Sequence, residues 1–272
     1  MAVLITGAKG FIGSRLVSFL KEAGFDLVNF AADITDRQAV LSWSSDKKIE
    51  AVIHLAAIMG GRNKSLFKKI NIDGTGNIIE LCKKIRAGRL IFMSSLRALS
   101  SEPDDPYVNS KKEAEKLVID SGLPYVVLRP SMIYGPGDKK NIGFLLKIAR
   151  TLPLVPVFNF RLQPLFVDDV ARVIMACFKA APNQTINLAG QETISYADLL
   201  ELLKVKGYKI RRLNAPRLFN FLLKIFSCLP FSPLPYWQVK TLLADEIFAG
   251  SQWPGKFNIK WTSLEEGMAK VV

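Results

Sequence analysis

The chain contains few of the residues that build metal centres and disulfide frameworks. Its 272 residues include one histidine, His54, and three cysteines with no Cys-x-x-Cys pair. A single histidine excludes histidine-based catalytic triads and histidine-rich metal centres. The three cysteines, Cys82, Cys177 and Cys228, are too widely spaced to indicate a disulfide framework or a zinc site. We therefore expect no bound metal, and free thiols in a reducing compartment.

Long basic runs and a leader segment are also missing. The net charge is +13, but no run of lysine or arginine exceeds two residues, and no nucleic-acid-binding motif accompanies it. This distribution is typical of solvated lysines and argues against a nucleic-acid partner. The first residues, MAVLITGAKG, lack a basic segment followed by a long apolar one, so we expect no signal peptide. The expected location is the cytoplasm.

What the first half does contain is a regular alternation of strand and helix patterns. Strands are predicted at AVLITGA, DLVNFA, AVIHLAA, RLIFMSS and YVVLRPS, with helical patterns between them. Strands alternating with helices of this length form right-handed crossovers, which produce a parallel sheet covered on both faces. The sequence therefore predicts an α/β fold with a doubly wound parallel sheet.

The pattern loosens after Arg129, where prolines interrupt the helical segments. A helix at FVDDVARVIMACFKA and a strand at TINLAG still continue the alternation. We therefore assign residues 1–130 and 164–189 to a nucleotide-binding domain. Residues 131–163 and 190–272 are assigned to a smaller, mostly helical C-terminal lobe that receives the substrate.

Three glycines separate the first predicted strand from the first predicted helix. They are Gly7, Gly10 and Gly13 of the segment TGAKGFIG. The first permits a tight turn, the second lets the backbone approach a pyrophosphate, and the third lets helix and strand pack closely. The helix N-terminus then offers N–H groups and its positive dipole end to the anion. With a strand before it and a helix after it, this turn predicts dinucleotide binding in a Rossmann-type domain.

The choice between NAD and NADP depends on the end of the second strand. The tip reads Asn29, Phe30, Ala31 and offers no carboxylate for the ribose 2′-hydroxyl. Lys9, inside the glycine turn, could meet a 2′-phosphate, although a solvated lysine explains it equally well. These residues leave both cofactors open and favour NADP.

Tyr107 and Lys111 are four residues apart in the predicted helix after Pro106, so they share a helix face. A free tyrosine has a pKa of about 10, and shifting it to about 7 requires roughly 4 kcal/mol. An ammonium group about 4 Å away contributes about this much free energy at an effective dielectric constant of about 20, but only about 1 kcal/mol in water. The pair can therefore transfer protons only if it is shielded from solvent; otherwise it is an ordinary solvated pair.

An ordered set of motifs spans roughly the first 190 residues: TGAKGFIG, VIHLAA, NIDGTGNIIE, FMSSL, YVNSK, LRPSMIYGPGD and FVDDVA. In this order they resemble the extended branch of the short-chain dehydrogenase/reductase superfamily, the NAD-dependent epimerase/dehydratase family. The resemblance implies a Rossmann fold, NAD or NADP as cofactor and a Ser-Tyr-Lys active site. The last 80 or so residues match only loosely.

The resemblance also implies a role for individual residues. Ser95 would donate a hydrogen bond to the reacting oxygen, Tyr107 would be the general acid and base, and Lys111 its partner. The implied cofactor-binding residues are Gly7, Lys9, Gly10, Phe11, Ile12, Gly13, Asp33, Ile34, Leu55, Ala56, Ala57, Asn71, Tyr107, Lys111, Pro130 and Ser131. The candidate substrate contacts are Ser94, Met132 and Arg161.

The chain departs from the family pattern at three points. Ser95 and Tyr107 are only twelve residues apart, so the substrate entrance is expected to be more open. Met132 replaces an asparagine that often contacts a sugar nucleotide. Gln163, Pro164 and Leu165 stand before the Val-Asp-Asp motif where an arginine is frequent, and Arg161 lies slightly upstream. Arg161 could hold a phosphate, although a surface arginine is the simpler interpretation.

The segment at residues 217–231 is nearly apolar and follows Lys209, Arg211 and Arg212. It is too short to span a bilayer. The simpler interpretation is a buried helix of the substrate lobe. The alternative is peripheral contact with the inner, anionic face of a membrane, where the helix would admit a lipid-linked substrate.

The leading hypothesis is an NAD(P)-dependent oxidoreductase or epimerase that moves hydride to or from a carbinol or ketone carbon. The first substrate expectation is a phosphorylated sugar derivative, nucleotide- or lipid-linked, with sugar 4-ketoreductase favoured over epimerase. The alternative is a non-catalytic NAD(P)-binding sensor or assembly protein of the same fold. The resemblance also implies a homodimer formed through two helices.

Overall fold

The computed structural model describes residues 1–61, 63–100, 104–151, 154–229, 231–232, 236–243, 247–248 and 252–271. The chain separates into two compact units. Unit 1 comprises Met1–Pro130, Val167–Leu188 and Gln252–Lys260, and unit 2 comprises Ser131–Phe166, Ala189–Ser251 and Trp261–Val272.

Unit 1 is organised around a parallel sheet that has six strands within the described residues. In spatial order these are β2 (Asp26–Val28), β1 (Ala2–Thr6), β3 (Ile49–His54), β4 (Leu90–Met93), β5 (Tyr125–Pro130) and β10 (Gln184–Leu188). Every neighbouring pair is parallel. The chain moves from β1 outward to β2 and then returns to β3 on the other side of β1. The predicted α/β, Rossmann-type fold is confirmed, with its topological switch point between β1 and β3.

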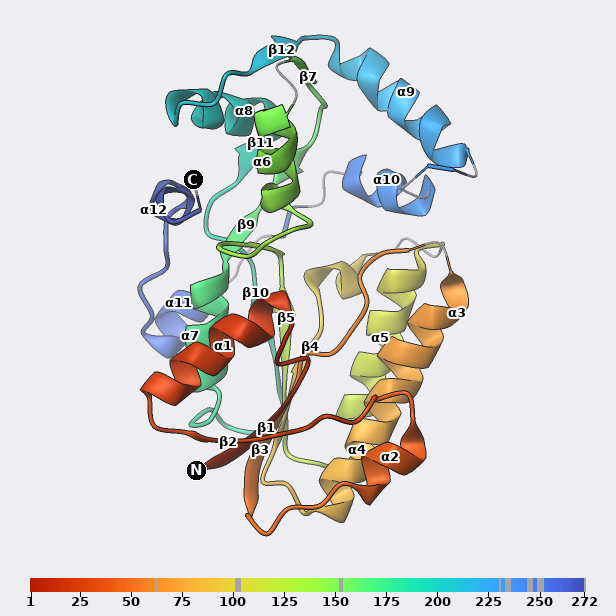
Figure 1. Ribbon diagram of the computed structural model, residues 1–272, viewed down its shortest axis with the longest axis vertical. Helices are drawn as coiled ribbons and strands as arrows, with labels where there is room; N and C mark the ends of the chain where they lie inside the picture. The colour runs from red at the N-terminus through yellow and green to blue at the C-terminus, as the bar shows by residue number, and fades with distance from the viewer. Residues whose placement is uncertain are drawn as a thin grey trace. The chain divides into compact units, whose positions relative to one another are not determined.

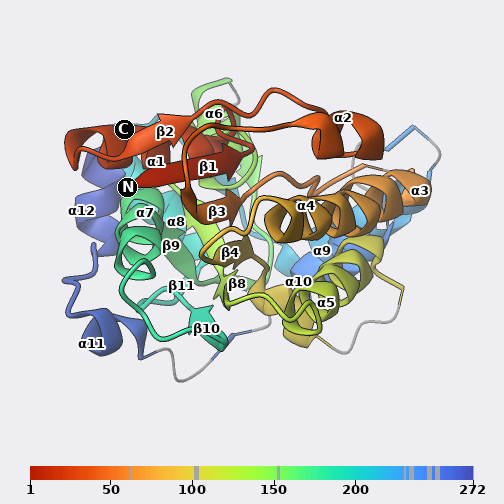
Figure 2. The ribbon, with the colours of Figure 1, turned by 90° about the horizontal axis from the view of Figure 1, so that it is seen from below.

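Helices cover both faces of this sheet (Figures 1 and 2). On one face α1 (Phe11–Glu22) packs against α7 (Val167–Ala176). On the other, α4 (Gly74–Lys84) contacts both α2 (Arg37–Ser42) and α5 (Pro106–Ile119). The inner strands are largely apolar because both of their faces are buried, as in β1, where all five residues are buried, whereas the edge strands β2 and β10 are partly exposed. Two short helices, α3 (Lys64–Phe67) and α11 (Trp253–Phe257), complete the unit.

Residues 252–260 belong to unit 1, whereas the sequence interpretation assigned all of 190–272 to the smaller lobe. Two hydrogen bonds attach this segment: Arg172 Nη1 donates to the Lys260 carbonyl at 3.1 Å, and Lys256 Nζ donates to Gln184 Oε1 at 2.5 Å. The Trp253 side chain is fully buried. A single large aromatic residue therefore anchors the segment, and no periodic pattern in the sequence indicated this.

Unit 2 contains short strand pairs and helices around its own core. The strands β6 (Met132–Tyr134) and β9 (Pro164–Phe166) pair in parallel, as do β7 (Leu154–Pro156) and β12 (Arg211–Leu213), whereas β8 (Arg161–Leu162) and β11 (Ile194–Ser195) are antiparallel. Its helices are α6 (Ile142–Thr151), α8 (Tyr196–Val205), α9 (Pro216–Cys228), α10 (Tyr236–Leu243) and α12 (Leu264–Ala269). The core includes Tyr134, Leu146, Phe166, Leu199 and Met268.

Helix α9 contains most of the apolar segment singled out at residues 217–231 and lies beside α10 (Figure 1). The expectation of a buried helix is wrong, because only Ser227 of its residues is buried. Of the helices that the structure describes, none is long and apolar enough to cross a membrane.

Candidate active site

The turn after β1 brings the first and third glycines against neighbouring backbone. Gly7 has φ +74°, and a Cβ there would lie 2.8 Å from the Ala56 nitrogen. A Cβ on Gly13 would lie 2.2 Å from the Gly7 carbonyl oxygen. Gly10, the N-cap of α1, has no side chain that could occupy the helix end, and the first turn of α1 contains no acidic residue. The end of α1 thus keeps its N–H groups and positive dipole end for an anion.

The loops after β1 and β3 meet at the switch point of the sheet. Leu55 N donates to the Thr6 carbonyl at 3.2 Å, which places Leu55, Ala56 and Ala57 beside the glycine turn. Ligands of open α/β sheets bind at this edge. The predicted cofactor-binding residues of this turn, including Lys9, Phe11 and Ile12, are therefore grouped at one position in unit 1.

The residues expected near the adenine lie after β2. Asp33 is exposed, and its carboxylate accepts a hydrogen bond from Thr35 N at 2.9 Å, which lowers the pKa of Asp33. Ile34 is buried, and its carbonyl accepts from Asn77 Nδ2 at 2.8 Å. Strand β2 ends at Val28, before the predicted DLVNFA strand does, and Trp43 Nε1 donates to the Asn29 carbonyl at 3.0 Å.

Ser95 and Tyr107 lie close to each other, because the Ser95 hydroxyl is near enough to the Tyr107 phenol to lower its pKa. Ser95 follows β4 and caps the 3-10 helix Leu96–Leu99, accepting from Arg97 N at 3.3 Å. Tyr107 stands in the first turn of α5, where Asp105 is the N-cap and accepts from Tyr107 N at 2.9 Å. Tyr107 is only 7% exposed. A helix cap and a strand end thus place the two hydroxyls side by side, away from bulk water.

Lys111 is buried one helical turn beyond Tyr107, with 4% exposure. Its Nζ donates to the Met93 carbonyl at 2.8 Å and lies 5.1 Å from the centre of the Phe92 ring. Burial lowers the pKa of Lys111 to about 8, while the negative charge of Glu115 opposes that decrease. At neutral pH the amine therefore remains mostly protonated.

Glu115, a further turn along α5, connects the helix to β5 and to the end of β4. Its Oε2 accepts from the Ser94 hydroxyl at 2.7 Å and from Arg129 Nε at 3.0 Å, and Arg129 Nη2 donates to its Oε1. The Ser94 hydroxyl is thereby used inside unit 1, and its role as a substrate contact stays a prediction. Because Tyr107, Lys111 and Glu115 are spaced by four residues, the glutamate lies on the same helix face as the other two. This spacing was visible in the sequence, but no role was predicted from it.

Asn71 lies in a π-helical turn, Lys68–Asp73, which precedes α4. Its Nδ2 donates to Ser110 Oγ at 2.9 Å and to the Ile58 carbonyl at 3.0 Å, and its Oδ1 accepts from Ile58 N at 2.9 Å. Ser110 Oγ donates in turn to the Tyr107 carbonyl at 2.8 Å. Asn71 therefore connects the loop after β3 to the turn of α5 that holds Tyr107. π-Helical turns of this kind are frequent at functional sites.

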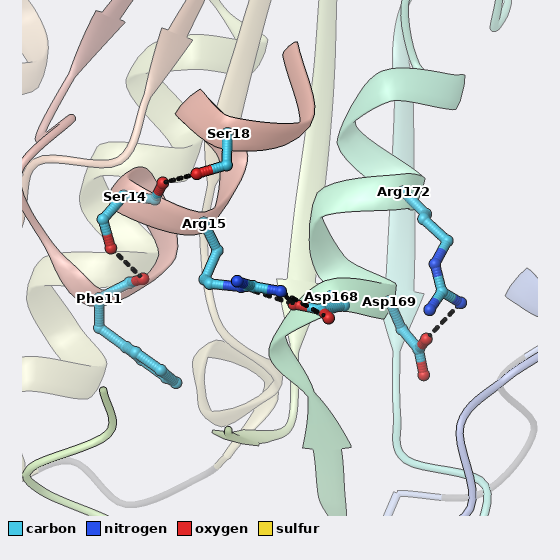
Figure 3. A network of polar contacts seen from close by, with 7 residues as sticks. All are labelled: Phe11, Ser14, Arg15, Ser18, Asp168, Asp169 and Arg172. Carbon is cyan, nitrogen blue, oxygen red and sulfur yellow. Dashed lines mark hydrogen bonds and ion pairs between the residues drawn. The ribbon is translucent and has the colours of Figure 1, made fainter. Parts of the chain in front are cut away.

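The acidic pair of the FVDDVA motif holds helices together within unit 1 (Figure 3). Asp168 Oδ1 and Oδ2 accept from Arg15 Nε and Nη2, each at 2.8 Å, which joins the first turn of α7 to α1. Asp169 accepts from Arg172 Nη1 at 2.8 Å. Asp168 therefore supports the helix that begins at the glycine turn, whereas the ion pair of Asp169 with Arg172 lies within α7.

Pro130, the last residue of β5, is buried in unit 1. The other predicted residues, Ser131, Met132 and Arg161, belong to unit 2. Ser131 Oγ accepts from Gly190 N at 3.0 Å, Met132 packs on the unit 2 core, and Arg161 is exposed. Among the described residues, no group of histidine, cysteine, aspartate and glutamate side chains could hold a metal ion.

Comparison with known proteins identifies the family. Residues 3–189 match the model of the NAD-dependent epimerase/dehydratase family. The chain belongs to this family. It is an NAD(P)-dependent enzyme of the short-chain dehydrogenase/reductase superfamily, as the ordered motifs indicated.

Individual relatives of the enzyme differ in the reactions they catalyse. The chain is 25% identical to a UDP-glucose 4-epimerase of Vibrio cholerae, over 75% of both proteins. It is 27% identical to a 2-alkyl-3-oxoalkanoate reductase of Stenotrophomonas maltophilia, over 80% of this chain and 77% of the relative. The solved structure of Thermus thermophilus UDP-glucose 4-epimerase with NAD superposes with a TM-score of 0.77 at 19% identity, covering 100% of this chain and 97% of that chain.

The glycine turn and the N-terminus of α1 provide hydrogen-bond donors that suit a dinucleotide. The turn is narrow enough that a Cβ at Gly7 or Gly13 would contact backbone, and the N-cap of α1 is a glycine without a side-chain hydrogen bond. Gly7, Gly10 and Gly13 would hold the pyrophosphate, and Lys111 and Tyr107 would face the reactive end. When bound, the nicotinamide supplies or accepts a hydride.

The glycine turn gives the first prediction. Gly13→Ala is expected to lower dinucleotide affinity at least about tenfold, because its Cβ would displace the Gly7 carbonyl, 2.2 Å away, and misplace the pyrophosphate donors. The matched control is Gly76→Ala in α4, where a Cβ meets nothing within 4 Å. Titration of cofactor fluorescence measures both. Equal dinucleotide affinities of Gly13→Ala and the wild type would show that the glycine turn does not bind the dinucleotide.

The only histidine belongs to a buried hydrogen-bond chain. His54 Nδ1 and Thr6 Oγ1 are 2.6 Å apart, and Nε2 lies 3.0 Å from Thr75 Oγ1, which donates to the Asn71 carbonyl at 2.6 Å. Because Thr75 uses its proton on Asn71, it accepts from Nε2–H, and Nδ1 accepts from Thr6. The ring is therefore neutral. Burial, aided by the charge of Lys111, lowers the pKa of His54 to about 3.

This buried histidine predicts acid sensitivity. The folded pKa of about 3 lies below the ordinary histidine pKa of 6.5, so the unfolded chain binds more protons between these pH values, and stability falls as pH falls. The expected loss at pH 5 relative to pH 8 is about 2 kcal/mol in the free energy of unfolding. His54→Gln should remove this dependence, since the chain has no other histidine. Parallel urea titrations test it, and identical pH slopes in the two proteins would refute the prediction.

Proposed function

We propose that the enzyme moves hydride between a nicotinamide cofactor and a carbinol or ketone carbon through Ser95, Tyr107 and Lys111. The observation that carries the proposal is that Ser95 and Tyr107 are both buried and close enough for the serine hydroxyl to lower the pKa of the phenol, one helical turn from the buried amine of Lys111. A protein that only binds a nucleotide, the alternative considered from the sequence, has no need of these three groups in one buried cluster.

The electrostatics of Tyr107 support the reductive direction. Burial raises the pKa of Tyr107, whereas the Ser95 hydrogen bond and the charge of Arg97 lower it. Because the pKa is raised overall, desolvation has a larger effect than Ser95 and Arg97 together. At neutral pH the hydroxyl is protonated and can donate its proton to the oxygen of a ketone as hydride reaches the carbon. Ser95 holds the same oxygen, and the Lys111 ammonium stabilises the phenolate that remains.

A sugar 4-ketoreductase acting on a nucleotide- or lipid-linked sugar is the activity that we propose, with 4-epimerase as the second candidate. Relatives named as UDP-glucose 4-epimerase and UDP-glucuronate 4-epimerase support a phosphorylated sugar derivative, and the relative named as an oxoalkanoate reductase supports reduction. The replacement of the usual asparagine by Met132 leaves the redox residues unchanged and changes only a substrate contact.

The stoichiometry of cofactor consumption separates the two reactions. A panel of keto and hydroxy sugar nucleotides is incubated with the enzyme while nicotinamide absorbance and product are measured together. A reductase oxidises one NAD(P)H for each product molecule, whereas an epimerase forms product with constant absorbance. Product without net oxidation would contradict the ketoreductase, and failure of every carbonyl substrate would contradict the reaction class.

We also propose a preference for NADP, which rests on the missing carboxylate after β2 and on the exposed Lys9 in the turn. NADPH is expected to bind about tenfold more tightly than NADH, because a hydrogen bond to a charged group contributes about 1.5–3 kcal/mol. Lys9→Gln should remove most of the difference and leave NADH affinity unchanged. Fluorescence titration with both cofactors measures it, and tighter binding of NADH would contradict the preference.

The same proposal includes a homodimer and a cytoplasmic location. The three free cysteines, two of them buried, support a reducing compartment. Light scattering tests the dimer, and a mass equal to one chain across micromolar concentrations would refute it.

A further inference from the structure

Helix α9 has an inverted distribution of polar and apolar residues. Its large apolar side chains are exposed, among them Phe221 at 59% and Ile225 at 50%. Asn220 faces inward, where its Nδ2 donates to the Asn159 carbonyl at 3.3 Å and its Oδ1 accepts from Asn159 N at 3.2 Å. The buried residue of the helix is Ser227. A surface helix of a globular protein normally buries the apolar stripe and exposes the polar one.

The exposed side chains form one continuous stripe. They are Leu218, Phe221, Leu222, Ile225, Phe226 and Leu229, followed by Phe231 at 72% exposure. At about 100° per residue the five of these residues that belong to α9 span an arc of about 140°. The arc on the opposite side contains Phe219, Leu223 and Ser227, and Phe219 packs on Phe158 with ring centroids 6.3 Å apart. The helix is thus attached to unit 2 by one side and offers an apolar face on the other.

The segment that contains this face is rich in basic residues, of which Lys204 and Arg212 form ion pairs with Glu201. Residues 202–244 include eight basic residues and no acidic one: Lys204, Lys206, Lys209, Arg211, Arg212, Arg217, Lys224 and Lys240. Arg217 and Lys224 belong to α9, are exposed, and lie along one margin of the apolar stripe. Long basic side chains beside an apolar helix face are typical of helices that lie in the interface of a bilayer.

We propose that α9 is a membrane-docking helix that lies flat in an anionic lipid surface, with the stripe from Leu218 to Phe231 among the acyl chains. The 13 residues of α9 give a length of about 20 Å, which suits an in-plane position and is too short to span the bilayer. Arg217 and Lys224 reach the acidic headgroups from the margin of the stripe. This inference concerns a surface of unit 2 and does not depend on the reaction.

The charge distribution favours a lipid surface over a second copy of the chain. In a two-fold contact through α9, each stripe would place Arg217 and Lys224 against the same basic segment of the other copy, which has no acidic residue between positions 202 and 244. Like charges facing each other oppose such a contact. Anionic headgroups complement them, and they attract lysine and arginine close to the surface.

Vesicle flotation of the full-length enzyme tests the proposal. Vesicles of phosphatidylcholine with one third phosphatidylglycerol are expected to carry the protein, and vesicles of phosphatidylcholine alone at least about tenfold less. Lys224→Gln should weaken binding to the anionic vesicles about fivefold. Failure of the wild type to bind anionic vesicles would overturn the proposal, as would equal binding to both kinds.

Matched variants separate the apolar stripe from general surface hydrophobicity. Ile225→Gln, in the middle of the stripe, should lower vesicle affinity about tenfold or more. Val205→Gln is the control, since Val205 is aliphatic, 82% exposed and outside α9. The control should change affinity less than about twofold. Equal losses in both variants, or an oligomer in solution that Ile225→Gln dissociates, would assign the stripe to another role.

A label on the helix itself reports its depth. Cys228 is exposed, whereas Cys82 and Cys177 are buried, and burial raises the pKa of both thiols to about 12. An environment-sensitive fluorophore therefore attaches to Cys228 of the natural chain. On anionic vesicles its emission should shift to shorter wavelength and be quenched by lipids that carry spin labels near the headgroups. Emission unchanged by vesicles that do bind the protein would show that another surface docks.

Discussion

Replacing Tyr107 by phenylalanine is expected to lower turnover about 10²–10⁴-fold, the usual contribution of a positioned general acid. The phenol is buried beside Ser95, so no water takes over the proton transfer with the same geometry. The ring is retained, and it lies 5.7 Å from the Arg97 guanidinium carbon, so packing is preserved. Turnover is followed by nicotinamide absorbance with a ketone substrate from the panel.

The control for this substitution is Tyr236→Phe, which removes an exposed hydroxyl in unit 2 and should leave turnover unchanged. Dinucleotide affinity of Tyr107→Phe should stay within about threefold of wild type, because the glycine turn is untouched. If Tyr107→Phe retains more than about one tenth of the wild-type rate, the phenol is not the proton donor.

Replacing Glu115 by glutamine is expected to destabilise the enzyme by about 3–5 kcal/mol. The substitution keeps the shape of the side chain but leaves the partly buried Arg129 guanidinium and the nearby Lys111 ammonium without their counter-charge. The pKa of Lys111 should also fall below its wild-type value of about 8, because the charge of Glu115 is what opposes the effect of burial. Urea-induced unfolding measures the first effect.

The matched control is Glu80→Gln, which breaks an ion pair of 2.6 Å between Glu80 and Arg37 in which both side chains are largely exposed. Such pairs contribute at most about 1 kcal/mol. Comparable losses in the two variants would show that the Glu115 network acts no differently from a surface pair.

The sequence predicted the parts of the site that depend on spacing along one element. Gly7, Gly10 and Gly13 mark the turn because the strand and the helix on either side are unmistakable. Tyr107 and Lys111 share a face because four residues make about one helical turn. That Ser95 would meet Tyr107 came from the family resemblance, since no local pattern relates the end of β4 to the start of α5.

Other features depend on tertiary contacts that a linear pattern does not contain. The network of Glu115, Ser94 and Arg129 joins three elements, and residues 252–260 are held in unit 1 by Trp253. The segment 217–231 was expected to be buried because its composition is apolar. Composition does not reveal which side of α9 faces the protein, and the inward side proved to contain Asn220 and Ser227.

The direction in which the pKa of Tyr107 shifts could not be predicted from the sequence either. A single ammonium at about 4 Å was expected to acidify the phenol. In the protein, the Lys111 amine donates to the Met93 carbonyl, and desolvation raises the phenol pKa. The protein alone therefore prepares Tyr107 as an acid, and a positively charged nicotinamide would be required to make it a base.

Ionisation of Tyr107 can be measured without knowing the substrate. The phenolate absorbance of wild type minus that of Tyr107→Phe isolates this residue across the alkaline pH range. Without cofactor we predict that the midpoint of this ionisation lies above 10.0, the ordinary pKa of tyrosine. We also predict a phenolate at clearly lower pH when oxidised dinucleotide is bound, and loss of that shift in Lys111→Met. A titration that oxidised dinucleotide leaves unchanged would contradict the proposed site.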